Sequence, residues 1–127
     1  MVTTNRPVVL QLPADPALLR VARVTVTSVA AVLPLTLQDV EDLRVAVDEL
    51  AAVLIEGCDT GAVLAIEVAV VDDAVVVTGR VAGVGPAPEL HPVAVDLLGL
   101  VAPEHELGSD GDDRWFRFAK RPQVPTP

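Results

Sequence analysis

The chain has 127 residues, of which 51% are hydrophobic but only 2% aromatic, and its formal net charge is −9. This length predicts a single domain, residues 1–127, with a core at about 7–120 built from Val, Leu and Ala. The acidic balance argues against binding of nucleic acid or of an anionic membrane through bulk charge. The polar or Pro-rich ends, 1–6 and 121–127, are expected to be flexible.

Cys58 is the only cysteine, which excludes an internal disulfide and favours a reducing compartment. The sequence has no charged-then-apolar leader and no apolar run of ~20 residues, so neither a signal peptide nor a membrane span is predicted. We therefore expect a cytoplasmic protein.

Residues 6–13, which contain two prolines, predict a first strand. Residues 14–33 predict a first helix, with Asp15 as its N-cap and Pro16 in its first turn. Apolar residues at helical spacing predict the core-facing side of this helix, namely Leu18, Ala22, Thr25, Val29 and Leu33.

Residues 36–57 predict a second helix. Thr36 is its expected N-cap, Asp39 three residues later suggests a capping box, and Gly57 is a natural C-terminal stop. The core stripe of this helix is predicted to consist of Val40, Leu43, Val47, Leu50 and Leu54.

Residues 62–83 predict a strand hairpin that turns at Asp72 and Asp73. The alternation typical of a half-buried strand falls on Leu64, Ile66, Val68 and Val70.

Residues 90–101 predict a third helix, followed by two strands within 105–120 around a Gly/Asp turn. One side of this helix is expected to carry Leu90, Val93, Ala94, Leu97 and Leu98, and Phe116 and Phe118 share one face of the last strand. This order of elements predicts an α+β fold, a two-layer sandwich of a mostly antiparallel sheet with the helices on one face.

No motif of established chemistry stands out. The sequence has no recognisable Ser-His-Asp arrangement, metal-ligand cluster, Walker loop or Rossmann fingerprint. His91 and His105 are isolated and are interpreted as surface or packed side chains, and Cys58 as a small packed side chain.

Residues 12–57, with the "ARVTV" pentad at 22–26 and "AVDEL" at 46–50, resemble the RsbW/SpoIIAB-type anti-sigma factor serine kinases. The resemblance extends over about 8–120 and is most specific in the first half. It implies the Bergerat, or GHKL histidine-kinase-like, ATPase fold. The cofactors of that family are ATP and magnesium.

The family's second helix carries Glu-x-x-x-Asn, whose Glu polarises the attacking group and whose Asn holds the magnesium ion. Here Glu49 matches the Glu, but Val53 stands at the Asn. In the family's Asp-x-Gly-x-Gly motif, whose Asp reads the adenine amino group, Gly83 and Gly85 match the glycines but Val81 replaces the Asp.

The family's Gly-rich lid has no clear counterpart beyond Gly99. We therefore expect no nucleotide or metal cofactor and interpret Glu49 as the remnant of a catalytic residue. The alternative is a helix-surface carboxylate without a role.

The resemblance also implies protein partners. The family sequesters a sigma factor, and a STAS-type antagonist releases it. Arg23 matches the arginine with which the family contacts its partners, and Arg20 and Thr27 are expected beside it on the same helical face. The alternative is a solvated arginine that keeps the helix soluble. Relatives pair through the first strand and the neighbouring sheet surface, so a homodimer is expected.

Three functions follow as hypotheses. The first is an anti-sigma factor-like regulator that binds a sigma factor, a STAS-type antagonist, or both, without efficient ATP hydrolysis. The second is an active serine/threonine kinase of the antagonist, and the third is a non-catalytic adaptor outside the sigma circuit.

Overall fold

The computed structural model describes residues 6–123. Its elements, in chain order, are β1 (Val8–Pro13), a 3-10 turn η1 (Pro16–Leu18), α1 (Leu19–Ala30), α2 (Leu37–Ile55), β2 (Val63–Val71), β3 (Ala74–Val81), α3 (Pro92–Val101), β4 (His105–Asp110) and β5 (Asp113–Lys120). None of the helices within this range combines the length and the apolar content that a membrane crossing needs.

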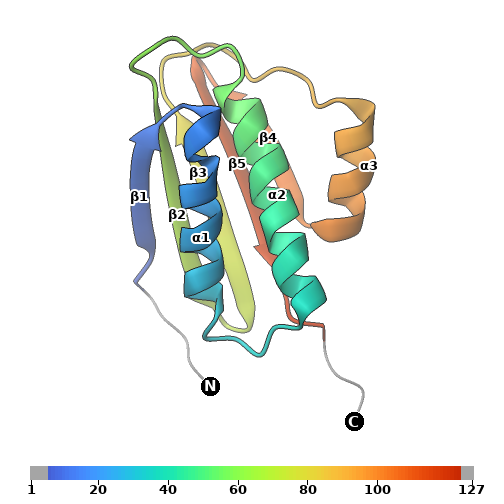
Figure 1. Cartoon of the computed structure of the whole chain (residues 1–127). Coiled ribbons are helices and arrows are strands. Elements are labelled where there is room, and N and C mark those ends of the chain that lie inside the picture. Colours follow the sequence, from blue (N-terminus) through green and yellow to red (C-terminus); the bar gives the residue numbers. More distant parts are fainter. Residues whose placement is uncertain (1–5, 124–127) are drawn as a thin grey trace.

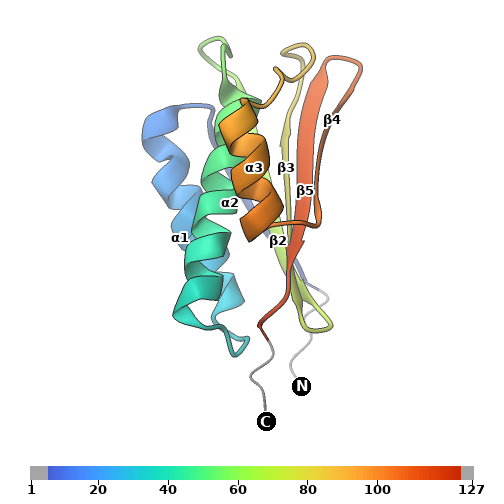
Figure 2. The ribbon, with the colours of Figure 1, turned by 90° about the vertical axis from the view of Figure 1, so that its right-hand side faces the viewer.

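The strands form one sheet in the order β1-β2-β3-β5-β4, and every neighbouring pair is antiparallel (Figure 1). The three helices lie on the same side of this sheet, and no element of residues 6–123 covers the other side (Figure 2). The predicted α+β two-layer sandwich is therefore confirmed.

The core lies between the sheet and the helices. Along β2 the alternation predicted from the sequence is confirmed, because Leu64, Ile66, Val68 and Val70 are all fully buried. The hairpin turns at Asp72, which has a positive φ of 53°, and at Asp73. On β5, Phe116 and Phe118 both point into the core, as expected.

The close approach of β3 and β5 needs a glycine. Gly79 pairs directly with Phe116, whose ring lies over the glycine backbone, and a Cβ at position 79 would collide with this ring. The ring therefore fills the place of a side chain on the neighbouring strand.

The start of the first helix is capped as predicted, but its first turn is a 3-10 turn, which is tighter than an α-helical turn. The Asp15 side chain accepts a hydrogen bond from the amide of Ala17 at 2.9 Å, and the chain forms η1 before α1 begins at Leu19. The predicted core face was partly wrong, because Val26 is buried in place of Thr25. The Thr25 hydroxyl instead donates to the carbonyl of Val21 at 2.8 Å.

The second helix follows the prediction closely. Thr36 and Asp39 form a reciprocal capping box. Of the predicted core stripe only Val40 is partly exposed. The fully enclosed residues of this stripe are Leu43, Val47, Leu50 and Leu54.

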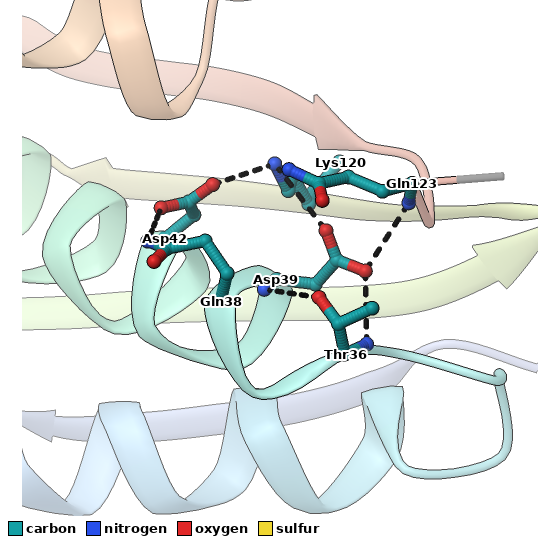
Figure 3. A network of polar contacts seen from close by, with 6 residues as sticks. All are labelled: Thr36, Gln38, Asp39, Asp42, Lys120 and Gln123. Atoms are coloured by element: carbon teal, nitrogen blue, oxygen red, sulfur yellow. Dashed lines mark hydrogen bonds and ion pairs between the residues drawn. The ribbon is translucent and has the colours of Figure 1, made fainter. Parts of the chain in front are cut away.

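A cluster of charges that the sequence did not indicate lies at the N-terminal end of α2 (Figure 3). The Asp39 side chain is completely buried, and its Oδ1 lies 3.8 Å from the Lys120 ammonium. The same ammonium contacts Asp42 at 2.9 Å, and Gln38 donates to Asp42 at 2.8 Å. This network joins the end of β5 to the first turn of α2.

The third helix is only partly as expected. Ala94 and Leu98 are buried, but Val93 is 67% exposed, because the sheet lies on the opposite side of the helix. The ends of the chain were expected to be flexible, and residues 1–5 and 124–127 lie outside the described residues. Within 121–123, Arg121 pairs with Glu104 at 3.2 Å and the amide of Gln123 donates to Asp39 at 3.2 Å.

Candidate functional site

Glu49 and Val53 lie one helical turn apart on α2 and line the same hollow, of about 410 Å³. The hollow lies between α2 and the segment that leads into α3, and its other walls are Ala52, Glu56, Glu89, His91 and Ala94. Within residues 6–123 the Glu49 side chain has no hydrogen bond or ion pair. Glu49 and Val53 therefore lie side by side at this hollow, and a catalytic role for Glu49 stays a prediction.

The lining of this hollow does not suit a nucleotide with its metal ion. Glu49, Glu56 and Glu89 repel phosphate groups, and Val53 has no oxygen for a hard cation. His91 Nδ1 is engaged, because it accepts a hydrogen bond from the amide of Val93 at 3.1 Å and so caps α3. Among the described residues no group of three acidic, His or Cys side chains is placed to hold a metal ion. ATP and magnesium therefore do not fit the side chains present here.

The remaining residues of the expected nucleotide pocket do not line this hollow. Val81 is fully buried in the core, where it pairs with Arg114 across β3 and β5. Gly83 and Gly85 have positive φ angles of 72° and 86° in the loop between β3 and α3. Gly99, the residue that was compared with that family's lid, lies inside helix α3.

Arg114, which was not among the expected site residues, occupies the space between that loop and the C-terminal end of α2. The residue is only 6% exposed. Its guanidinium donates to the carbonyls of Leu54 at 2.9 Å and Glu56 at 2.7 Å on the helix side. On the loop side it donates to the carbonyls of Gly85 at 3.1 Å and Val84 at 3.3 Å.

The loop is held by the residues before Arg114 as well. The amides of Val84 and Gly85 both donate to the carbonyl of Asp112 at 2.9 Å, and the amide of Gly83 donates to the Asp113 carboxylate at 2.9 Å. This amide and then the Arg80 guanidinium lower the pKa of Asp113. Residues 112–114 thus bind both the N–H and the C=O groups of residues 83–85.

A signal for Arg114 was present in the sequence. On a strand, every second side chain points to the same face. Arg114 therefore had to share a face with Phe116 and Phe118, which were already assigned to one side of the last strand. A charged residue in that position predicts a buried cation with partners.

The second candidate site is the outer face of α1. A hollow of about 380 Å³ is lined by Arg20, Arg23, Val24 and Thr27 of α1 and by Val40 and Arg44 of α2. Arg20, Arg23 and Thr27, which were expected on one helical face, all line this hollow. Arg44 of α2, which was not among the expected partner-binding residues, lines the same hollow. Three of the nine cationic residues of this acidic chain therefore meet at one place.

Arg23 is half-buried and carries its own counter-ion. Its guanidinium lies 3.3 Å from Asp48 of α2, with both side chains partly exposed. Burial raises the pKa of Asp48, against the opposing attraction of Arg23 and Arg44. The Thr27 hydroxyl donates to the carbonyl of Arg23 at 2.9 Å. The apolar side chain of Val24 is 63% exposed and lines the hollow together with Arg20, Arg23 and Arg44.

The isolated residues of the sequence analysis have structural roles. His91 caps α3, as above, and His105 Nδ1 lies 2.6 Å from the carbonyl of Ala102 at the end of that helix. The thiol of Cys58 is half-buried, contacts the carbonyl of Leu54 at 3.4 Å and lies 3.6 Å from the guanidinium of Arg114.

Comparisons with known proteins add one finding. No family model matches the sequence, and no curated protein matches it. Among solved structures, the chain is similar to the RsbU and RsbW domains of Rv1364c from Mycobacterium tuberculosis, with 18% identity and a TM-score of 0.70. The match covers 95% of this chain and 34% of that one, so this chain spans about a third of the length of its neighbour. At this identity the likeness shows a shared fold, in keeping with the resemblance of residues 12–57.

Proposed function

We propose that this protein is an anti-sigma factor-like regulator that binds a sigma factor, a STAS-type antagonist, or both, through the outer face of α1, and does so without efficient ATP hydrolysis. The observation that carries the proposal is the hollow where Arg20, Arg23 and Arg44 surround the exposed side chain of Val24. Arginine is enriched in binding hot spots. In a chain of charge −9, such a cationic hollow suits an acidic partner surface.

The chemistry at the end of α2 supports the absence of efficient catalysis. The hollow at Glu49 is acidic and lacks the oxygen of an Asn at position 53. Binding would therefore be stoichiometric, and release would come from exchange between two partners.

Arg23 provides the test. Sigma factors and STAS-domain proteins of the host, produced one at a time, are titrated calorimetrically with the wild-type chain and with Arg23→Gln. Loss of one member of a desolvated charge pair costs about 2–5 kcal/mol, so we expect binding to weaken roughly 30-fold or more. Arg121→Gln is the control, since Arg121 is likewise paired with one carboxylate but is not among the residues that line the α1 hollow.

Asp48→Asn sharpens the test. Because the raised pKa of Asp48 means that folding favours its protonated form, its charge does not contribute stability at neutral pH. We expect the free energy of unfolding to stay within about 0.5 kcal/mol of wild type. The freed Arg23 should bind the partner at least as tightly as before. Unchanged affinity in Arg23→Gln, with a partner that does bind the wild type, would remove the α1 surface from the proposal.

Two alternatives are separated by direct measurements. An active serine/threonine kinase would bind ATP with magnesium in a manner that depends on Glu49, and Glu49→Gln would abolish phosphorylation of the STAS protein. A non-catalytic adaptor would bind neither sigma factors nor STAS proteins, whatever the nucleotide.

We also propose a homodimer through β1 and the uncovered side of the sheet. β1 is an edge strand whose Val8 and Val9 are 42% and 61% exposed. Val9 and Trp115 line a hollow of about 480 Å³ on that side. Light scattering at tens of micromolar should give twice the chain mass, and Val9→Glu should halve it. A monomeric wild type would refute the dimer without touching the α1 surface.

A further inference from the structure

Arg114 is a buried cation that contacts four backbone carbonyls and one sulfur atom. These neighbours belong to two segments, residues 54–58 at the end of α2 and residues 84–85 of the loop before α3. Within residues 6–123 no carboxylate lies at ion-pair distance from it. A buried charge without a counter-ion needs another source of negative potential.

The end of α2 is that source. The last carbonyls of a helix have no partner within the helix and form the negative end of its dipole. The carbonyls of Leu54 and Glu56 belong to this end, and Arg114 binds both. The planar fork of the guanidinium also reaches the loop at the same time.

The loop is shaped to complete the site. The positive φ angles of Gly83 and Gly85, which glycine adopts without strain, fold the chain back so that the carbonyls of Val84 and Gly85 accept from Arg114. Their amides meanwhile donate in the other direction, to Asp112.

We propose that the end of α2 and residues 83–85 form a guanidinium-binding site, and that Arg114 is its built-in ligand. By occupying the site, Arg114 keeps the loop closed over the end of the helix without any added molecule. The inference does not depend on the proposed partners, because it concerns only the closing of this loop.

The test removes the ligand and supplies it again. In Arg114→Ala, hydrogen exchange at the amides of residues 83–85 should accelerate at least roughly tenfold, while the amides of β2 keep their protection. Methylguanidinium at about 10 mM should restore that protection and raise the melting temperature in a saturable way, whereas methylammonium should not. Arg117→Ala, an exposed arginine on the same strand, is the matched control.

Two results of this experiment would contradict the role of Arg114 as a built-in ligand. Unchanged exchange at residues 83–85 in Arg114→Ala would overturn the proposal, and so would methylguanidinium rescue that is absent or equally large in Arg117→Ala. If Arg114→Ala does not fold, Arg114→Lys keeps the charge without the fork and should still accelerate exchange in the loop.

The wild-type protein gives an independent measurement. The Nε–H of Arg114, bound to the carbonyl of Gly85, should exchange with water far more slowly than that of Arg117 by NMR. Equal rates for the two arginines would contradict the built-in ligand even if no variant could be prepared.

Discussion

Both ends of α2 are held by a cation from the helix-facing side of β5, but with different partners. At the C-terminal end Arg114 binds backbone carbonyls directly. At the N-terminal end Lys120 reaches the helix only through the side chains of Asp39 and Asp42 (Figure 3).

The helix dipole explains the difference. The C-terminal end of a helix is negative and accepts a cation, whereas the N-terminal end is positive and repels one. The Asp39 carboxylate accepts from the amide of Thr36, the N-cap of α2, and faces Lys120 on its other side. A negative group therefore stands between the positive end of the helix and the cation. One strand can therefore bind both ends of one helix with cations only if acidic residues stand at the N-terminal end.

The largest expected loss of stability follows from removing the direct contact between Arg114 and the C-terminal end of α2. Arg114→Met should lower the free energy of unfolding by about 3–5 kcal/mol, because it leaves several buried carbonyls without a donor. Urea denaturation at pH 7 measures this loss, and Arg117→Met should stay within about 0.5 kcal/mol of wild type. A cost for Arg114→Met as small as that of Arg117→Met would contradict the comparison.

A smaller loss of stability is expected from a substitution at the N-terminal end of α2. Lys120→Met leaves Asp39 and Asp42 buried without their cation, which is strongly destabilising for isolated pairs. Here the amides of Thr36 and Gln123 and the side chain of Gln38 still donate to these carboxylates. We therefore expect about 2–3 kcal/mol by the same denaturation, and a loss greater than that of Arg114→Met would reverse the proposed ranking.

The smallest expected loss of stability concerns Asp39, and it depends on pH. Burial alone would raise the pKa of Asp39, but hydrogen bonds from Thr36 and Gln123 and the charge of Lys120 lower it below the ordinary value of 3.8. Its contribution to stability is therefore complete above that value and is lost as the pH falls through the lower pKa of the folded state. Asp39→Asn should cost about 1–2 kcal/mol at pH 7.

Unfolding curves of wild type and Asp39→Asn recorded from pH 7 down to about pH 2 should converge at the acid end. Glu41→Gln, an exposed neighbour in the same turn, should leave the acid dependence unchanged. Parallel curves for wild type and Asp39→Asn over the whole range would show that the pKa of Asp39 is not lowered.

Patterns of local origin were predicted well. The alternation of Leu64 to Val70 fixed the buried face of β2, and the Thr36 and Asp39 pair marked the start of α2. The first helix was harder because Val24, Thr25 and Val26 are all β-branched, and a stripe shifted by one residue fits the same sequence almost as well.

Contacts between distant segments were not predictable in the same way. The pairing of Asp39 with Lys120, or of Arg114 with the end of α2, requires the order of strands in the sheet, which the sequence does not state. The alternation of side chains along β5 could have shown that Arg114 is buried. On the helical repeat of α2, Asp39 lies on the same face as Leu43 and Leu50, which could have shown that Asp39 is buried too. The partners of either residue could not be read from such a pattern.

The position of β5 in the sheet has a consequence for how the chain folds during synthesis. β5 lies between β3 and β4, although it follows both in sequence. Until the ribosome has released it, β4 has no strand to pair with and β3 has a free edge. Phe116, Phe118 and both cations that hold α2 arrive together in this one segment. We therefore expect a nascent chain ending before Asp113 to stay open and bound by chaperones, and the whole core to close in one late step.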